Sequence, residues 1–417
     1  EDIRKKILYT LFIILIFRIG ASIPVPFING DYIAAYFSNS SGNLLGYLNM
    51  ISGNALSTGT IFAMTIQPYI NASIIIQLLT VAIPYFERLA KDGGEEGKKK
   101  LNKITRYSTL VIALLQAIGY YKILESASAL RVGANGFETF VIAATIIVTL
   151  IAGSCLVMWL GESIDGKGIG NGISMILFAS IVSRGAEFLM YLVNEIQQGR
   201  WWMTLLILVF AVLMFAFIVF MDNAERRIPI QYAKRQVGRR MYGGQSTHLP
   251  IKVAMTGVMP IIFTFAIVSL PATIGAFWPT SGYTKWVEQY FSQTSPLYII
   301  LTFILIIAFN YFYIAIQYNP TEIANNIKSN GGTIPGIRPG QPTVDFIMRS
   351  VNKVTLFGAL FLGVIAVLPF IFQIIFPESQ GLALGGTSML ILVSVSLETV
   401  KVLESQMLMR HYKGFLE

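Results

Sequence analysis

The feature that most constrains the fold is an apolar segment that carries more polar side chains than a simple membrane anchor needs. Residues 66–79 (IQPYINASIIIQLL) lie in a run long enough to cross a bilayer, yet they include the amides of Gln67, Asn71 and Gln77. An amide in hydrocarbon costs free energy unless it is hydrogen-bonded. Polar groups at this depth indicate a helix that faces protein, water or a passing substrate. Hydrogen bonding between packed helices is the simpler alternative.

The segment before this run is also unusual. Residues 43–58 (NLLGYLNMISGNALST) are half apolar and too short to span a bilayer. A short re-entrant element beside a broken, polar membrane helix is typical of a pathway through the membrane rather than an anchor.

The composition is that of a polytopic membrane protein. Of the 417 residues, 54% are hydrophobic and 13% are charged, which is about half the charged share of soluble proteins. The apolar runs do not alternate as the strands of a membrane β-barrel would. We therefore expect an all-α membrane protein with ten transmembrane helices, a short re-entrant helix and two long loops. The predicted spans lie near residues 7–23, 61–83, 107–123, 139–160, 173–193, 202–221, 253–274, 297–316, 354–375 and 386–405.

The distribution of basic residues predicts the orientation. With ten spans, 25 of the 31 Lys and Arg residues fall on the side of the two termini, four on the opposite side and two within spans. Basic loops favour the cytoplasmic side of a membrane. Both termini of this multi-pass chain are therefore expected in the cytoplasm.

Two of the basic loops are longer than topology requires. Residues 222–252 and 317–353 contain apolar and aromatic residues among their bases, so we expect them to be structured. The second loop should contain a short helix capped by Thr321. A structured basic loop in the cytoplasm is suited to docking an acidic or large partner. Attachment to anionic lipid is the alternative.

The sequence offers little for catalysis, and we expect no enzyme activity, metal or cofactor. Its two histidines, His248 and His411, lie outside the spans, and Cys155 is its only cysteine. A single cysteine excludes an intrachain disulfide and a multi-cysteine metal site. Zinc-protease and serine-hydrolase motifs are absent. The glycine-rich residues 165–172 lack the phosphate-loop pattern, and we predict a tight turn that enters an N-capped helix.

Carboxylates within the spans are also few. They include Glu187 and Glu398, each with a basic residue three positions away, Arg184 or Lys401, and we expect two helical ion pairs. Ion-coupled transporters place free carboxylates near mid-membrane. A passive conduit whose energy comes from cytoplasmic partners is therefore favoured. A secondary transporter for small solutes and a scaffold subunit remain as alternatives.

Several ordered strings resemble a known family. They are FRIG (17–20), PYINASIIIQLLT (68–80), GIGNGIS (168–174), YAKRQVGRR (232–240), QSTHLP (245–250), NPTEIA (319–324), PGIRPG (335–340) and GGTS (385–388). Over essentially its whole length the chain is similar to the SecY family of protein-conducting channels. The resemblance implies an hourglass pore between an N-terminal half (1–195) and a C-terminal half (196–417).

In that family an aliphatic ring closes the pore and a re-entrant plug blocks its outer side. The resemblance assigns the ring to Ile66, Ile70, Ile173, Leu177, Ile262 and Ile391. It assigns the plug to residues 44–58, with Leu44, Leu45, Tyr47, Leu48, Met50 and Ile51 as its apolar side chains. The first two ring residues are one helical turn apart, as are the next two, so each pair faces one direction.

The resemblance also implies a lateral gate and a set of partners. Gln67, Asn71 and Gln77 would lie near a seam with the seventh span, which opens toward lipid. The motor ATPase SecA or the ribosome would dock on Lys234, Arg235, Arg239, Arg240 and Arg338. Other implied partners are the small subunits SecE and SecG, secretory precursors, signal peptides and anionic lipids, with no small-molecule substrate. The implied location is the bacterial cell (inner) membrane.

Overall fold

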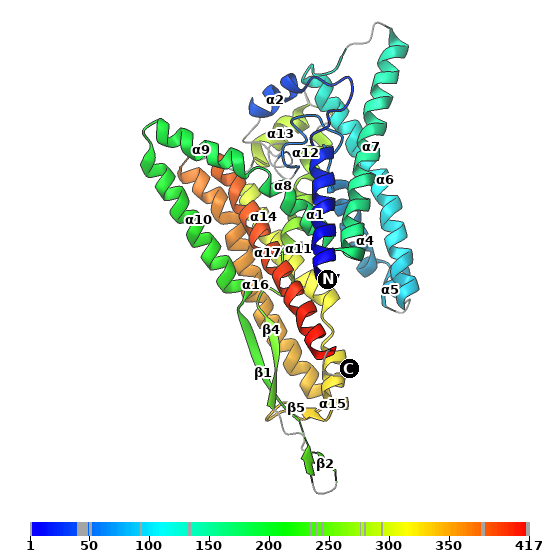
Figure 1. The fold of residues 1–417 in the computed structure, drawn as a ribbon, viewed down its shortest axis with the longest axis vertical. Coiled ribbons are helices and arrows are strands. Elements are labelled where there is room, and N and C mark those ends of the chain that lie inside the picture. Colours follow the sequence, from blue (N-terminus) through cyan, green and yellow to red (C-terminus); the bar gives the residue numbers. More distant parts are fainter. Residues whose placement is uncertain are drawn as a thin grey trace.

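The computed structural model is a bundle of helices with a β-structured projection at one end (Figure 1). It describes residues 2–39, 49, 52–91, 94–131, 135–232, 235–237, 240–242, 246–275, 277–278, 281–292, 295–376 and 380–413. The helices are α1 (Asp2–Gly20), α2 (Gly30–Asn39), α4 (Gln67–Ala82), α5 (Pro84–Lys91), α6 (Gly94–Ser126), α7 (Gly136–Lys167), α8 (Gly172–Val182), α9 (Gly185–Gln197), α10 (Trp201–Asp222), α11 (Met259–Val268), α12 (Leu270–Gly275), α13 (Gly282–Tyr290), α14 (Pro296–Gln317), α15 (Pro320–Ser329), α16 (Gln341–Ile375) and α17 (Gln380–Lys413). The strands are β1 (Glu225–Tyr232), β2 (Arg235–Val237), β3 (Arg240–Tyr242), β4 (Ser246–Lys252) and β5 (Gly332–Thr333).

All ten predicted spans contain helix, and the fold class is that of an all-α membrane protein. In the described part of the chain, five helical runs are long and apolar enough to cross a membrane: α6, α7, α10, α14–α15 and α16. The pair α4–α5 is a sixth candidate, bent by 105°. The exact number of crossings stays a prediction.

Two of the predicted spans are each divided between two helices. Within 173–193, α8 ends at Val182 and α9 starts at Gly185, and within 253–274, α11 ends at Val268 and α12 starts at Leu270. The second break precedes Pro271, which has no amide hydrogen to continue the helical bonding. Breaks of this kind are tolerated at membrane depth where the protein buries them.

The predicted second span is irregular over its first residues. Residues 60–66 form a bridge and turns, and helix α4 begins only at Gln67, with Pro68 in its first turn. The backbone N–H of Ile61 donates to the carbonyl of Ile23 (3.0 Å). Two glycines let other helices approach this segment closely: a Cβ on Gly153 would lie 2.0 Å from the Ile61 carbonyl oxygen, and one on Gly20 would overlap the Phe62 ring. The segment is thereby held inside the bundle, next to the start of α4.

This close approach predicts an effect on stability. We expect Gly153→Ala to lower the free energy of unfolding by about 1–3 kcal/mol, because the added methyl group overlaps main-chain atoms that cannot rotate away. Gly166→Ala is the control on the same helix, since its Cβ would meet open space. Thermal unfolding midpoints of both purified variants would test this. A Gly153→Ala midpoint at or above that of Gly166→Ala would contradict the packing.

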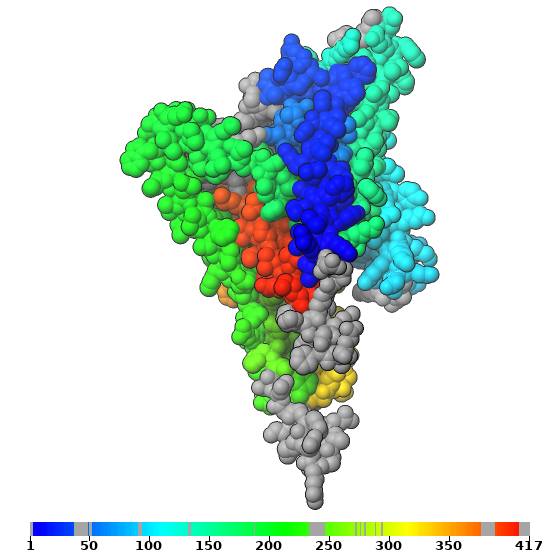
Figure 2. Space-filling view, viewed as in Figure 1, coloured from blue at the N-terminus to red at the C-terminus, as the bar shows by residue number. Residues whose placement is uncertain are grey.

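Two groups of helices flank a central pair. Figure 2 shows α1 (blue) and α17 (red) side by side, and Lys6 Nζ donates to Gln406 Oε1 between them (3.4 Å). Helices α9 and α10 (green) lie on one flank, and α5 and α6 (cyan) on the other. Helices α4, α8 and α11 complete the interior, where α17 packs against α8 and α11 packs against α4.

The two long loops, predicted separately, form one unit that we call the stalk: β1, β4, β5, α15 and the first turns of α16. Strand β1 pairs antiparallel with β4 and, at its end, with β5, in a three-stranded sheet. Ile228 and Ile230 of β1 share a buried apolar cluster with Ile327 of α15 and Ile347 of α16. The stalk projects from the end of the bundle to which both termini are directed (Figure 1).

Three details of these loops differ from expectation. The sheet was not predicted, and the second loop ends at residue 340, because α16 starts at Gln341. The predicted cap Thr321 was wrong: the side chain of Asn319 accepts the N–H of Glu322 (3.4 Å), and Pro320 follows at the first helical position. Proline is favoured there because its missing N–H is not needed.

Candidate functional site

The six predicted ring residues lie in one apolar cluster at the centre of the bundle. Ile66, Ile70, Leu177, Ile262 and Ile391 are buried in it, and Ile173 packs against it half-buried. This cluster is the largest in the described part of the chain and draws side chains from both halves of the sequence. A role as the closing ring stays a prediction.

Four of these side chains surround a narrow cavity. Ile70 (α4), Leu177 (α8), Ile262 (α11) and Ile391 (α17) line a space of about 20 Å³, which holds roughly one water molecule. The other lining residues are Gln67, Ile181, Phe265 and Ala266. Of the described residues in this lining, Gln67 alone is polar. The cavity is therefore an apolar constriction at the meeting of four helices.

A second, larger cavity lies next to the constriction on the stalk side. Its volume is about 280 Å³, and its polar lining residues are Asn171, Ser174, Asp222, Lys252, Thr256, Tyr313, Gln317, Ser394, Glu398 and Lys401. Helices α8, α11 and α17 line both cavities. On each helix, a residue that lines the constriction and a residue that lines the larger cavity are three positions apart. The pairs are Leu177 and Ser174, Ile262 and Met259, and Ile391 and Ser394. Three residues rise about 4.5 Å along a helix. We call this space the vestibule.

The glycine-rich loop before α8 places two vestibule residues. As predicted, it leads into an N-capped helix: Asn171 Oδ1 accepts the N–H of Ser174 (3.2 Å). The N–H of Gly172 donates to Asp165 Oδ1 (2.7 Å), and a Cβ at Gly172 would lie 2.0 Å from the carbonyl oxygen of Gly161. Only glycine permits this approach, so the loop holds the start of α8 firmly against α7.

The ion pair expected between Glu398 and Lys401 was wrong. Lys401 Nζ instead lies 2.5 Å from Asp222 Oδ2 and 3.3 Å from the Asp222 carbonyl oxygen, which joins α17 to the end of α10. These residues are 179 positions apart, so no local spacing in the sequence indicated the pair. The side chain of Glu187 lies outside the described residues.

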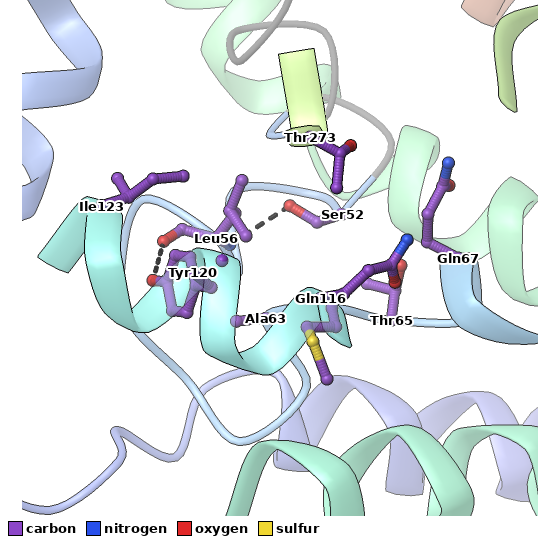
Figure 3. A pocket seen from close by; sticks show the side chains of 11 residues that line it. Ser52, Leu56, Ala63, Thr65, Gln67, Gln116, Tyr120, Ile123 and Thr273 are labelled. Carbon is purple, nitrogen blue, oxygen red and sulfur yellow. Dashed lines mark hydrogen bonds between the residues drawn. The ribbon is translucent and has the colours of Figure 1, made fainter. Parts of the chain in front are cut away.

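A third cavity, of about 70 Å³, lies between residues 52–65, α6 and α12. Figure 3 shows Gln67, Gln116 and Thr273 around it. Gln67 also lines the constriction, so the two spaces share a wall. The Tyr120 hydroxyl donates to the carbonyl oxygen of Leu56 (2.5 Å), which ties the second half of the predicted plug segment to α6.

The predicted gate residues have different surroundings. Gln67 faces both cavities, whereas Asn71 is buried without lining either. Gln77 Nε2 donates to Ser73 Oγ on its own helix (3.3 Å). Gln116 was missed, although it is a side-chain amide within an apolar run, the same signal that identified Gln67.

Other predicted residues are described only in part or not at all. The plug side chains Leu44, Leu45, Tyr47, Leu48, Met50 and Ile51 lie outside the described residues, as do the docking residues Lys234 and Arg239. The backbones of Arg235 and Arg240 lie in β2 and β3. Arg338 is exposed on the stalk, and its carbonyl oxygen accepts the Thr343 hydroxyl (2.9 Å). The described residues contain no cluster of His, Cys, Asp and Glu suited to a metal.

Known proteins share this sequence and fold. The SecY family model matches residues 60–400. The protein translocase subunits SecY of Streptomyces galbus and Bacillus subtilis (strain 168) are 43% and 42% identical, over 100% of this chain and 97% of each relative.

Solved structures agree on the fold. One titled "The structure of a protein conducting channel" has a TM-score of 0.70 at 19% identity, covering 97% of this chain and 92% of the other. "Sec61 in the Canine ribosome-channel complex from the endoplasmic reticulum" has a TM-score of 0.67 at 17% identity, with the same coverage. The family match and the two relatives show that the chain belongs to the SecY family.

Proposed function

We propose that the chain is a passive protein-conducting channel for unfolded polypeptides. The observation that carries this proposal is that the polar vestibule leads directly to an apolar constriction. On each of three helices, the residues that line the two spaces are only three positions apart. An apolar constriction resists ions by excluding water. Its aliphatic side chains also offer no specific contact, so a chain of any sequence can pass. Ile66, Ile70, Ile173, Leu177, Ile262 and Ile391 form the ring in this proposal, between the halves 1–195 and 196–417.

The same channel releases hydrophobic segments sideways into the membrane. Gln67 lines both the constriction and the third cavity, and α6 and α12 also line the third cavity. Helix α4 packs against α11, which α12 follows. This arrangement supports a gate between α4 and α11–α12. Amides at such a seam hold it weakly, because they can exchange one partner for another. Asn71 and Gln77 belong to this gate, and residues 44–58 form the plug.

The driving partners act on the stalk. We place the contacts of SecA or the ribosome at Lys234, Arg235, Arg239, Arg240 and Arg338, since Arg binds carboxylates and phosphates through a planar fork. The small subunits SecE and SecG complete the complex. Its location is the bacterial inner membrane with both termini in the cytoplasm, and anionic lipids surround the basic side.

A stalled precursor tests the channel directly. In a Cys155→Ala background, Ile70→Cys is reconstituted with SecE and SecA, and a precursor with one cysteine and a folded tail is trapped in transit. We expect an ATP-dependent disulfide at position 70, because Ile70 lines the constriction. Ile75→Cys is the control on the same helix, since Ile75 is exposed on the outside.

The outcomes separate the alternatives. Crosslinking at position 75 but not at 70 would place the pore elsewhere. No protected precursor at all, with the partners bound, would contradict the channel. The comparisons give no support to a transporter of small solutes, and the constriction offers such a solute one amide, that of Gln67.

A further inference from the structure

The vestibule contains a carboxylate, that of Glu398, which has no role in the proposed channel function so far. Glu398 lines it from α17 and is exposed to its interior. The basic residue one turn away, Lys401, is held by the carboxylate and the carbonyl oxygen of Asp222. Among the described residues, Glu398 makes neither an ion pair nor a hydrogen bond. Its negative charge is therefore open to a cation that enters the vestibule.

A buried hydroxyl lines the same cavity without a partner. Ser174 is 2% exposed, and its Oγ has no hydrogen-bond partner among the described residues. Leaving a buried hydroxyl unsatisfied costs free energy, which a ligand with main-chain N–H or C=O groups would recover. The amides of Asn171 and Gln317 line the vestibule as well. The cavity thus combines one carboxylate without an ion pair, and the ammonium group of Lys252, with groups that can bind a peptide backbone of any sequence.

Its position limits which part of a substrate it can meet. Glu398 follows the constriction residue Ile391 by seven residues on α17, about 10 Å along the helix axis. A signal sequence has a positively charged segment directly before its hydrophobic stretch. With the hydrophobic stretch at the constriction and the seam, the charged segment lies at the height of Glu398.

We infer that the vestibule binds the basic segment of a signal sequence, with Glu398 as the acceptor of its ammonium or guanidinium groups. Ser174, Asn171 and Gln317 bind the main chain of that segment. This inference rests on the proposed function and adds a specificity-determining residue to it. The pairing of Lys401 with Asp222 leaves the Glu398 carboxylate without an ion pair on its own helix.

Transport of a charge series tests the inference. Three precursors share one hydrophobic stretch and differ only in the segment before it, which carries a charge of about +4, +2 or 0. The positively charged members of the series resemble ordinary signal sequences. With Glu398→Gln in the reconstituted complex, we expect initial rates to fall about three- to tenfold for the most basic precursor, as for loss of a charge-assisted contact. The neutral precursor should keep its rate, and Glu398→Asp should restore the charge dependence.

Lys252→Gln is the matched control, because Lys252 also lines the vestibule and makes no ion pair among the described residues. This substitution removes a positive charge from the vestibule, whereas Glu398→Gln removes a negative one, so it should not slow the transport of the basic precursors. An equal loss for all three precursors with Glu398→Gln, or the same loss with Lys252→Gln, would overturn the inference.

A binding measurement separates this inference from the channel proposal. Fluorescent synthetic signal peptides of the same charge series are titrated onto the detergent-solubilised complex. We expect Glu398→Gln to weaken only the basic peptides, and Ser174→Ala to weaken all of them about equally. Charge-independent affinities for Glu398→Gln would overturn the site even if transport proceeds. Glu398-dependent binding without any transport by the unmodified complex would contradict the channel and leave the site standing.

Discussion

Replacing Ile70 and Ile391 together with glycine should raise the ion conductance of the closed complex at least about tenfold. Both side chains are nearly fully buried and line a constriction with room for about one water molecule. Removing two branched side chains from the lining, one on α4 and one on α17, lets a continuous file of water form, and ions follow it. A decrease of only about 1.4 kcal/mol in the barrier gives a tenfold faster passage. Single-channel recording in planar bilayers measures the change.

The control places the same substitutions on the outer faces of the same two helices. Ile75→Gly with Val400→Gly removes two exposed side chains from α4 and α17 at the same cost in helix propensity. This pair should leave the conductance unchanged. If the two double variants leak equally, helix loosening explains the leak, and if neither leaks, the constriction lies elsewhere.

Local spacing alone did not select the ring residues. The pairs Ile66 with Ile70 and Ile173 with Leu177 are one helical turn apart, and the resemblance to a family chose them among many similar apolar pairs. The structure brings Ile70 and Leu177 together with Ile262 and Ile391, which come from distant parts of the chain. Periodicity predicts which side chains share a face of a helix, but it does not predict which helices meet.

Two of the misjudged features depend on partners that are distant in the sequence. Lys401 has Glu398 one turn away and was assigned to it, whereas its partner Asp222 comes from another helix. Neighbours three residues apart on a helix gain only about 0.2–0.5 kcal/mol, so a tertiary contact easily replaces them. The sheet of the stalk had a weak local signal, the alternating Ile228 and Ile230, within a loop that was judged by its charge.

Replacing Arg338 with glutamate should reduce SecA-driven transport at least about 30-fold while the protein stays folded. Arg338 is exposed and lies between Gly336 and Gly340, both in the left-handed backbone region (φ 81° and 107°). Its main chain is fixed by the bond from Thr343, and the nearby Ile334 is buried in the stalk. The loop therefore holds the backbone from which the Arg338 side chain extends into solvent. Losing a central arginine costs an interface about 2 kcal/mol or more, and a reversed charge adds repulsion.

Two further variants show whether the guanidinium itself makes the contact. Arg338→Lys keeps the charge but loses the planar fork, so transport should lie between that of the native protein and Arg338→Glu. Arg131→Glu reverses a charge that is also exposed but lies in a loop predicted on the opposite side of the membrane, and it should transport normally. SecA binding to the purified complex is measured with the transport rate. If binding and transport by Arg338→Glu are unchanged, the docking surface does not include Arg338. If binding persists and transport is lost, the residue acts after docking, when the motor pushes a chain toward the vestibule.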